Sequence, residues 1–309
     1  MTILKHQARR VAAVIALILA AATVQAKPTE SNSHVNKGIQ FAQQKQFDQA
    51  IQEFTTAIEA SPKNATAYIN RGMAYRSEQK FPEAMADFSK AIEIAPNDEM
   101  AYFQRGETYH IQKQFTEAIN DLSKAIELKP DDPLAWRFRG FVNLSHDMFD
   151  AAITDLNKAL ELQPNDPDAY RWRAAADRGL KKYNEAIADY SKSLEIKPDP
   201  DTFAKRGYTY VTYLQEYEKG IADYEQALKL NPNDYDTQQR LQYARSALAA
   251  KNAPPPTPTP TPTPAPGLMT PMNIGIGLAA LLVLVVIIFA LTRRRSVDSQ
   301  GEPRSGRIQ

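Results

Sequence analysis

Apolar residues recur with helical spacing through the middle of the chain, in paired stretches separated by short polar turns. In one such pair, Ala65 to Glu78 and Phe81 to Ala95 both place apolar side chains three and four residues apart. A proline follows each pair, and proline stops a helix because it has no amide hydrogen. The pattern therefore predicts helical hairpins, whose first and second helices we call helix A and helix B.

The hairpins repeat with a constant period. Prolines recur every 34 residues, at Pro62, Pro96, Pro130, Pro164, Pro198 and Pro232. A fixed period of this length is typical of stacked units that bury a core only against their neighbours. We predict six repeats, at 31–64, 65–98, 99–132, 133–166, 167–199 and 200–233.

The end of the array differs slightly from its middle. Helix A of the sixth repeat starts one residue early, and one extra residue precedes Tyr217. Residues 234–252 follow, with apolar side chains at Leu241, Ala244 and Leu248. An open stack exposes an apolar face, so we expect this segment to form a capping helix.

Small residues recur where the two helices of a hairpin must approach closely. They are Gly72, Ala84 and Ala91 in the second repeat and Gly106, Ala118 and Ala125 in the third. On these residues, about 31–233 resembles the tetratricopeptide repeat family. The resemblance implies an all-α fold, a right-handed superhelical solenoid of six helix-turn-helix repeats. It also implies that the chain binds a protein or peptide partner.

Oppositely charged residues recur at a fixed spacing on the two helices. Arg71, Arg105, Arg139, Arg173 and Arg206 are followed sixteen or seventeen residues later by Asp87, Asp121, Asp155, Asp189 and Asp223. In the first repeat the pair becomes Lys37 and Glu53. We predict a structural salt bridge between helix A and helix B in every repeat. The residues that we expect to cap helix B are Asp48, Thr116, Asp150 and Asn184.

Two apolar segments flank the repeats. Residues 1–26 combine a basic start, an apolar run and small residues before Ala26, which is typical of a secretory signal peptide; an uncleaved anchor is the alternative. Residues 253–271 are rich in proline, which alternates with threonine from Pro256 to Pro264, and predict an extended linker. Residues 272–292 are apolar and long enough for one transmembrane helix, and 293–309 begin with three arginines.

These flanks predict a single-pass membrane protein. Arginines directly after the apolar segment, with no charge before it, place the C-terminal tail in the cytoplasm and the repeats outside, in the periplasm or on the cell surface. The chain has no cysteine, which excludes disulfides and thiol chemistry. The repeat region is mildly acidic, so we expect no nucleic-acid partner.

No residue pattern indicates catalysis. The four histidines lie in separate segments without metal-ligand spacing, and no phosphate-binding or nucleophile motif occurs in the repeats. We therefore predict no enzyme activity, no cofactor and no metal.

The predicted binding site is the concave groove lined by helix A of each repeat. Repeats four and five stand out because they hold both tryptophans and several arginines. Arginine beside aromatic residues is typical of interaction hot spots and suits an acidic or aromatic peptide. The alternatives are that the arginine stems only cover apolar surface, or that the aromatic residues bind a glycan or cell wall. The predicted groove residues are Phe103, His110, Leu134, Arg137, Phe141, Arg171, Trp172, Arg178 and Tyr208.

Overall fold

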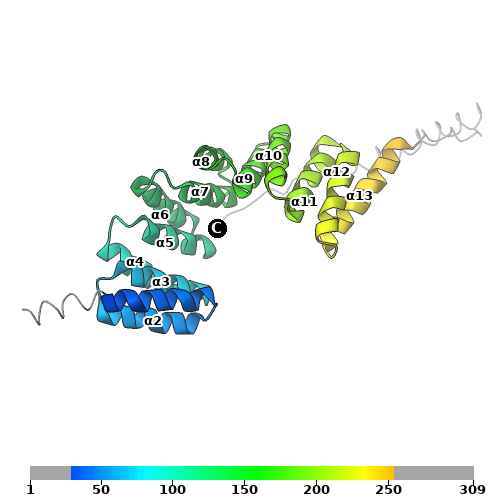
Figure 1. Ribbon diagram of the computed structural model, residues 1–309. Coiled ribbons are helices and arrows are strands. Elements are labelled where there is room, and N and C mark those ends of the chain that lie inside the picture. The colour runs from blue at the N-terminus through cyan, green and yellow to red at the C-terminus, as the bar shows by residue number, and fades with distance from the viewer. Residues whose placement is uncertain (1–28, 254–309) are drawn as a thin grey trace, which may run out of the picture. The chain divides into compact units, whose positions relative to one another are not determined.

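The 34-residue period folds into antiparallel helix pairs stacked one after another (Figure 1). The computed structural model describes residues 29–253, and it contains no strand in that range. The described helices lie in one compact unit that ends at Asn252. A first helix covers 29–43 of the described residues. The remaining helices are α2 (Phe47–Ala60), α3 (Ala65–Ser77), α4 (Phe81–Ile94), α5 (Glu99–Ile111), α6 (Phe115–Leu128), α7 (Pro133–Ser145), α8 (Phe149–Leu162), α9 (Pro167–Gly179), α10 (Tyr183–Ile196), α11 (Pro200–Thr209), the π-helix η1 (Tyr210–Leu214), α12 (Tyr217–Leu230) and α13 (Tyr235–Asn252).

The predicted all-α repeat fold is confirmed for the described residues. Each helix A packs on the helix B that follows it, and each helix B packs on the next helix A. Successive helix A elements also contact one another, as α3 does with α5 and α7 with α9. The first helices of neighbouring repeats therefore form a shared surface, which we call the helix A face.

The sequence predicted the wrong caps for helix B. Helix B begins at an aromatic residue, as α2 does at Phe47 and α6 at Phe115, so Asp48 and Thr116 lie inside the first turn; Asp150 and Asn184 do the same in α8 and α10. The residue before each of these helices makes no side-chain cap bond.

Capping side chains occur at helix A instead. Asp132 accepts a hydrogen bond from the backbone amide of Leu134, and the same position is filled by Asn64, Asp98, Asp166 and Asp199 at helix A of repeats two, three, five and six. At the turn from helix A to helix B, one residue has positive φ, such as Lys113 at 61°. This left-handed residue redirects the chain, so helix B starts without a capping side chain.

Small residues permit the close approach within each hairpin, as the sequence indicated. A Cβ atom on Gly106 would lie 3.0 Å from Leu122 Cγ and 3.2 Å from the carbonyl oxygen of Ala118. Ala118 and Ala125 are fully buried on the opposing helix. Larger side chains at these positions would separate the two helices.

The predicted salt bridges form one ladder through the stack. Arg139 donates Nε and Nη2 to the two carboxylate oxygens of Asp155, at 2.9 and 2.7 Å, and its Nη1 donates to Ser123 Oγ of the preceding repeat at 2.9 Å. Each ladder arginine makes the same kind of third bond, to Thr55, Ser89, Ser123, Asn157 or Ser191. The ladder therefore joins neighbouring repeats as well as the two helices of one hairpin.

The first repeat does not follow the predicted pairing. Glu53 Oε2 lies 2.5 Å from His34 Nδ1, and Lys37 is not its partner. His34 lies one turn before Lys37 on the first helix, so it reaches the same carboxylate from the same face.

The extra residue of the sixth repeat forms a π-helical turn. Helix α11 passes directly into η1, which ends at Leu214 and is followed by Gln215 with φ 56°. A π-turn adds one residue without changing the direction of the helix. The sequence located the insertion before Tyr217 but did not predict its conformation.

Helix α13 closes the described stack. It packs on α12, with Leu241 and Ala244 buried against Tyr224 and Val211. None of the helices in 29–253 is long and apolar enough to cross a membrane. The predicted signal peptide, transmembrane helix and tail, and all but the first residue of the predicted linker, lie outside the described residues.

Candidate functional site

Half-buried rings form a continuous cluster on the helix A face of repeats three to five. Phe141 of α7 stacks on Trp172 of α9, with ring centroids 4.5 Å apart and planes 27° apart. His110 of α5 lies 5.0 Å from Phe141, and Phe138 lies 5.7 Å from Phe103 and 5.9 Å from Phe141. We call these residues the ring cluster: Phe103, His110, Phe138, Phe141 and Trp172.

The repeat itself explains why these rings meet. Residues on successive helix A elements come together because those helices lie side by side. Phe141 is the residue after Gly140, the small residue of its repeat, and His110 lies one turn beyond the corresponding position of the preceding repeat. Burial lowers the pKa of His110 despite the nearby Glu107, so its ring is neutral at pH 7.

Two of the predicted groove arginines are already paired with carboxylates of the same chain. Arg137 Nη1 donates to Asp166 Oδ2 at 2.8 Å, and Asp166 is 2% exposed. Arg171 lies 2.7 Å from Asp168 and 3.3 Å from Asp201. These pairings, which the sequence analysis missed, link α7 to α9 and α9 to α11.

Arg137 also contacts the ring cluster. Its guanidinium carbon lies 5.8 Å from the centroid of Trp172. The predicted neighbourhood of these two residues is therefore present, but the arginine charge is balanced by Asp166. Leu134, 45% exposed near the start of α7, is not part of the cluster.

A second group of rings surrounds Arg178. Its guanidinium carbon lies 5.8 Å from the centroid of Tyr208, which meets Tyr213 edge-on at 5.7 Å. Tyr213 stacks on Tyr183 with centroids 4.4 Å apart and planes 9° apart. Of these residues only Arg178 and Tyr208 were predicted from the sequence. Tyr213 enters the site through the π-turn, and Tyr183 enters it from the start of α10.

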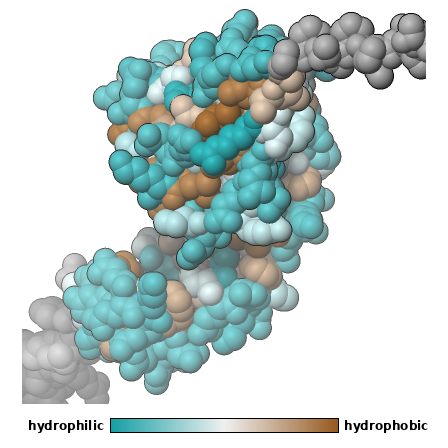
Figure 2. All heavy atoms as spheres, turned by 90° about the vertical axis from the view of Figure 1, so that its right-hand side faces the viewer, coloured by the Kyte–Doolittle hydropathy of each residue, from teal (hydrophilic) through white to brown (hydrophobic). Residues whose placement is uncertain are grey.

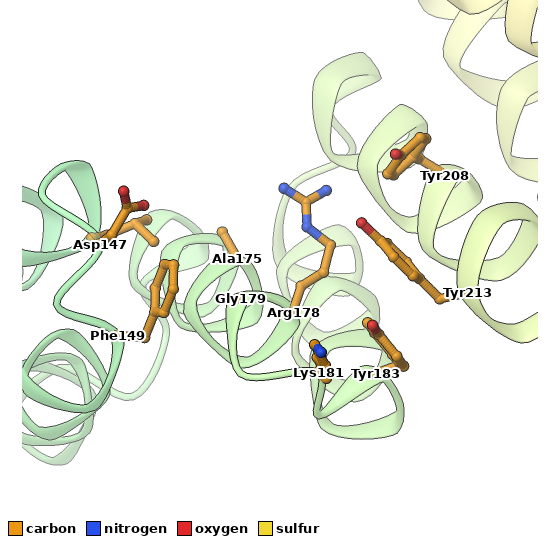
Figure 3. A pocket seen from close by; sticks show the side chains of 10 residues that line it. Asp147, Phe149, Ala175, Arg178, Gly179, Lys181, Tyr183, Tyr208 and Tyr213 are labelled. Atoms are coloured by element: carbon orange, nitrogen blue, oxygen red, sulfur yellow. The ribbon is translucent and has the colours of Figure 1, made fainter. Parts of the chain in front are cut away.

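These residues border a cleft of about 590 Å³ (Figure 3). Its walls combine apolar side chains with a few charged ones, as small ligand sites commonly do. The lining residues are Leu144, Asp147, Phe149, Ala175, Arg178, Gly179, Lys181, Tyr183, Tyr208 and Tyr213. In the view of Figure 2 the surface is mostly hydrophilic, with hydrophobic residues gathered in short brown bands.

The described residues contain no metal-ligand cluster. No group of three or more histidine and carboxylate side chains in 29–253 could hold a metal ion. The strongly shifted side chains there are buried tyrosines: burial raises the pKa of Tyr190 and of Tyr224 to about 12, which makes both hydroxyls poor acids at neutral pH. The site consists of rings, a cation and an apolar wall, which suit binding.

Family profiles of the tetratricopeptide repeat match the chain in successive segments. The matched residues are 38–77, 65–98, 88–120, 108–177, 169–200 and 201–234. No curated protein matches the sequence.

Solved structures share the fold. YrrB, described as a TPR protein with an unusual peptide-binding site, is 26% identical, with a TM-score of 0.51 over 65% of this chain and 98% of its own. A Pseudomonas aeruginosa pilF structure is 18% identical with a TM-score of 0.63, over 71% and 99%. The Cut9-Hcn1 structure is 19% identical with a TM-score of 0.61, over 74% of this chain and only 45% of that one. With its six helix pairs and the matched segments, the chain belongs to the tetratricopeptide repeat family.

Proposed function

We propose that this protein is a non-catalytic interaction scaffold, displayed on the outer side of a membrane, that binds an extended partner polypeptide along the helix A face. The observation that carries the proposal is the ring cluster. Five ring side chains from three successive repeats contact one another in a chain and stay half-buried: three of them pack their inner sides against the core but remain partly exposed. Aromatic side chains that stay partly exposed in this way are enriched at protein interfaces.

The family supports the same class of function. Tetratricopeptide repeats commonly bind protein or peptide partners, and the similar YrrB is described by its peptide-binding site. An extended chain could lie along neighbouring helix A elements and contact one repeat after another. Four residues predicted from the sequence would contact its side chains: Phe103, His110, Phe141 and Trp172.

Partner capture by ring variants tests the proposal. Phe141→Ala combined with Trp172→Ala should abolish capture of the partner by the full chain. Tyr235→Ala combined with Tyr243→Ala removes two aromatic rings that are 70% and 65% exposed on α13, and should leave capture intact. Equal capture by both double variants would refute the proposed face.

Salt separates a peptide from the rival ligand, a glycan of the envelope. A glycan stacked on the rings would bind with little dependence on ionic strength. A charged peptide held beside the arginines should be released as salt rises. We expect capture to weaken several-fold as NaCl rises from about 50 mM to about 500 mM.

The membrane arrangement is proposed from the sequence flanks. Because the chain has no cysteine, single cysteines can report topology without background. Ser246→Cys on α13 should react with a membrane-impermeant maleimide on intact cells, whereas Ser305→Cys should react only after permeabilisation. A protected residue 246 would contradict the proposed display.

A further inference from the structure

Arg178 occupies a repeat position at which another arginine is already neutralised. Arg76 holds the same position three repeats earlier, where its Nη1 lies 2.8 Å from Glu107 and its Nη2 donates to Gln104. The residue that corresponds to Glu107 beside Arg178 is Tyr208, one residue after Gly207. Arg178 therefore meets a ring where Arg76 meets a carboxylate.

The other arginines of this surface have carboxylate partners too. Arg137 pairs with Asp166, and Arg171 pairs with Asp168 and Asp201. Within residues 29–253, Arg178 makes no ion pair and no side-chain hydrogen bond. A half-buried guanidinium without an anion leaves its strongest possible interaction unmade.

The space in front of Arg178 can accept a ligand group. Figure 3 shows Arg178 and Tyr213 extending into one cleft, with Asp147 and Phe149 on its opposite side. Leu144, Phe149 and Ala175 supply an apolar wall, and the 41% exposed Tyr213 supplies a ring edge. The cleft volume of about 590 Å³ exceeds that of a single amino-acid side chain.

We propose that this cleft receives a carboxylate of the partner polypeptide at Arg178 and an adjacent apolar side chain of the same polypeptide at Leu144 and Phe149. This inference rests on the proposed function and specifies the partner. A guanidinium binds a carboxylate through two parallel N–H···O bonds, and the neighbouring tyrosine rings shield that pair from water. Lys181 adds positive charge on the same side of the cleft.

Asp147 limits which acidic peptides fit. Its carboxylate lines the cleft opposite Arg178 and would repel a second acidic side chain there. The expected motif is therefore a single Asp or Glu next to Leu, Ile or Phe, and not a run of acidic residues.

Peptide display tests this motif directly. A phage library of random 12-residue peptides is selected on the immobilised full chain, and the enriched peptides are titrated by fluorescence anisotropy. We expect the enriched peptides to share one acidic residue beside an apolar residue. Amidated and free-acid forms then distinguish an internal side-chain carboxylate from a C-terminal one.

Variants of Arg178 assign the binding to the cleft. Arg178→Gln should weaken these peptides about tenfold or more, since a charge-assisted bond contributes about 1.5–3 kcal/mol. Arg178→Lys should retain part of the affinity. Arg245→Gln changes an exposed arginine on α13 that does not line the cleft, and should have no effect. Circular dichroism must show each variant folded.

The outcomes separate this inference from the proposed function. Peptides that bind Arg178→Gln as tightly as the parent chain, or that lack acidic residues, would overturn the inference and leave peptide binding standing. A library that yields no enriched peptide would overturn both.

Discussion

Arg206 and Asp223 form the same two-bond ion pair as the other ladder residues, at 2.9 and 2.7 Å, although seventeen residues separate them instead of sixteen. The π-turn η1 absorbs the extra residue between the two side chains. The ion pair therefore keeps the geometry of the other ladder pairs, and the π-turn places the Tyr213 ring against that of Tyr183. We conclude that the insertion changes the cleft and leaves the stack intact.

Deleting one residue of the π-turn should separate these two effects. Without the exposed Thr212, the interval between Arg206 and Asp223 becomes sixteen residues and η1 should become α-helical. The melting temperature by circular dichroism should stay within a few degrees of that of the parent, since the ladder and core persist. Peptides selected on the cleft should bind more weakly. A deletion variant that fails to fold would show that the fold requires the π-turn.

A leucine at Gly106 should disrupt the third repeat. Its Cβ alone would lie 3.0 Å from Leu122 Cγ, so the two helices would have to separate. We expect a loss of unfolding free energy of about 1–3 kcal/mol or more, measured by urea denaturation. Glu117→Leu places the same side chain at an exposed position of α6 and should change stability by less than about 0.5 kcal/mol. Similar denaturation curves for both variants would reject the close approach.

Breaking the ladder should cost far more than breaking a surface ion pair. Asp155 is 3% exposed and accepts hydrogen bonds from Arg139 and Asn143. Asp155→Leu removes the only carboxylate that pairs with Arg139 and the acceptor of Asn143, while the Arg139 bond to Ser123 remains, and this should lower the unfolding free energy by about 3 kcal/mol. Glu127→Leu removes the exposed pair with Lys124 and should cost about 0.5 kcal/mol or less. Equal losses would mean that the ladder is not a structural element.

Asp177 should be a pH-dependent weak point in the fifth repeat. Burial, together with the like charge of Asp189, raises the pKa of Asp177 above its ordinary value of 3.8. The folded state therefore favours the protonated acid, so this group's contribution to stability is largest below pH 3.8 and is lost as pH rises through the raised pKa. Many other groups titrate in mild acid, so the effect of Asp177 has to be measured as a difference in stability between the parent and a variant that changes only residue 177.

Asp177→Asn is that variant. Asn143 holds the same position one repeat earlier and donates to Asp155 Oδ2 at 2.9 Å, so an asparagine at 177 should donate to Asp189 in the same way. At pH 7 the variant should melt higher than the parent, and the difference should shrink as the pH falls toward the ordinary pKa of 3.8. Two results would contradict this account: a variant that melts below the parent at pH 7, or a difference in melting temperature that is the same at pH 7 and near pH 3.8.

The fold could be predicted from the sequence because the same pattern of small, apolar and charged residues recurs in six repeats. The small residues Gly106 and Ala118 and their equivalents predicted where helices A and B touch. The spacing between arginine and aspartate predicted the ladder of ion pairs. The predicted caps of helix B were wrong because the turn before this helix depends on a residue with positive φ, such as Lys113. The residues at this position are mostly lysine and glutamine, which do not indicate a positive φ.

The candidate site was harder to predict because it depends on pairings between repeats. In the sequence, nothing distinguishes Arg178 from Arg137 and Arg171. The structure shows that Arg137 and Arg171 pair with carboxylates, whereas Arg178 lies against a tyrosine ring. Phe138 lies between the groove residue Arg137 and the ladder residue Arg139 in the sequence, and only its contacts with Phe103 and Phe141 place it in the site. The sequence could not show which side of the helix Tyr213 occupies, because the extra residue of the π-turn rotates its side chain away from the position that it would have in an α-helix.

Site-specific photo-crosslinking of the full chain in its host membrane tests the central claim most directly. Benzoylphenylalanine replaces Phe141 or Trp172 on the helix A face, Tyr213 in the cleft, or Tyr243 on the outer surface of α13. Binding of a partner polypeptide along the helix A face predicts discrete crosslinked products from positions 141, 172 and 213, and none from 243. Crosslinks from position 243 alone, with none from the other three, would contradict it.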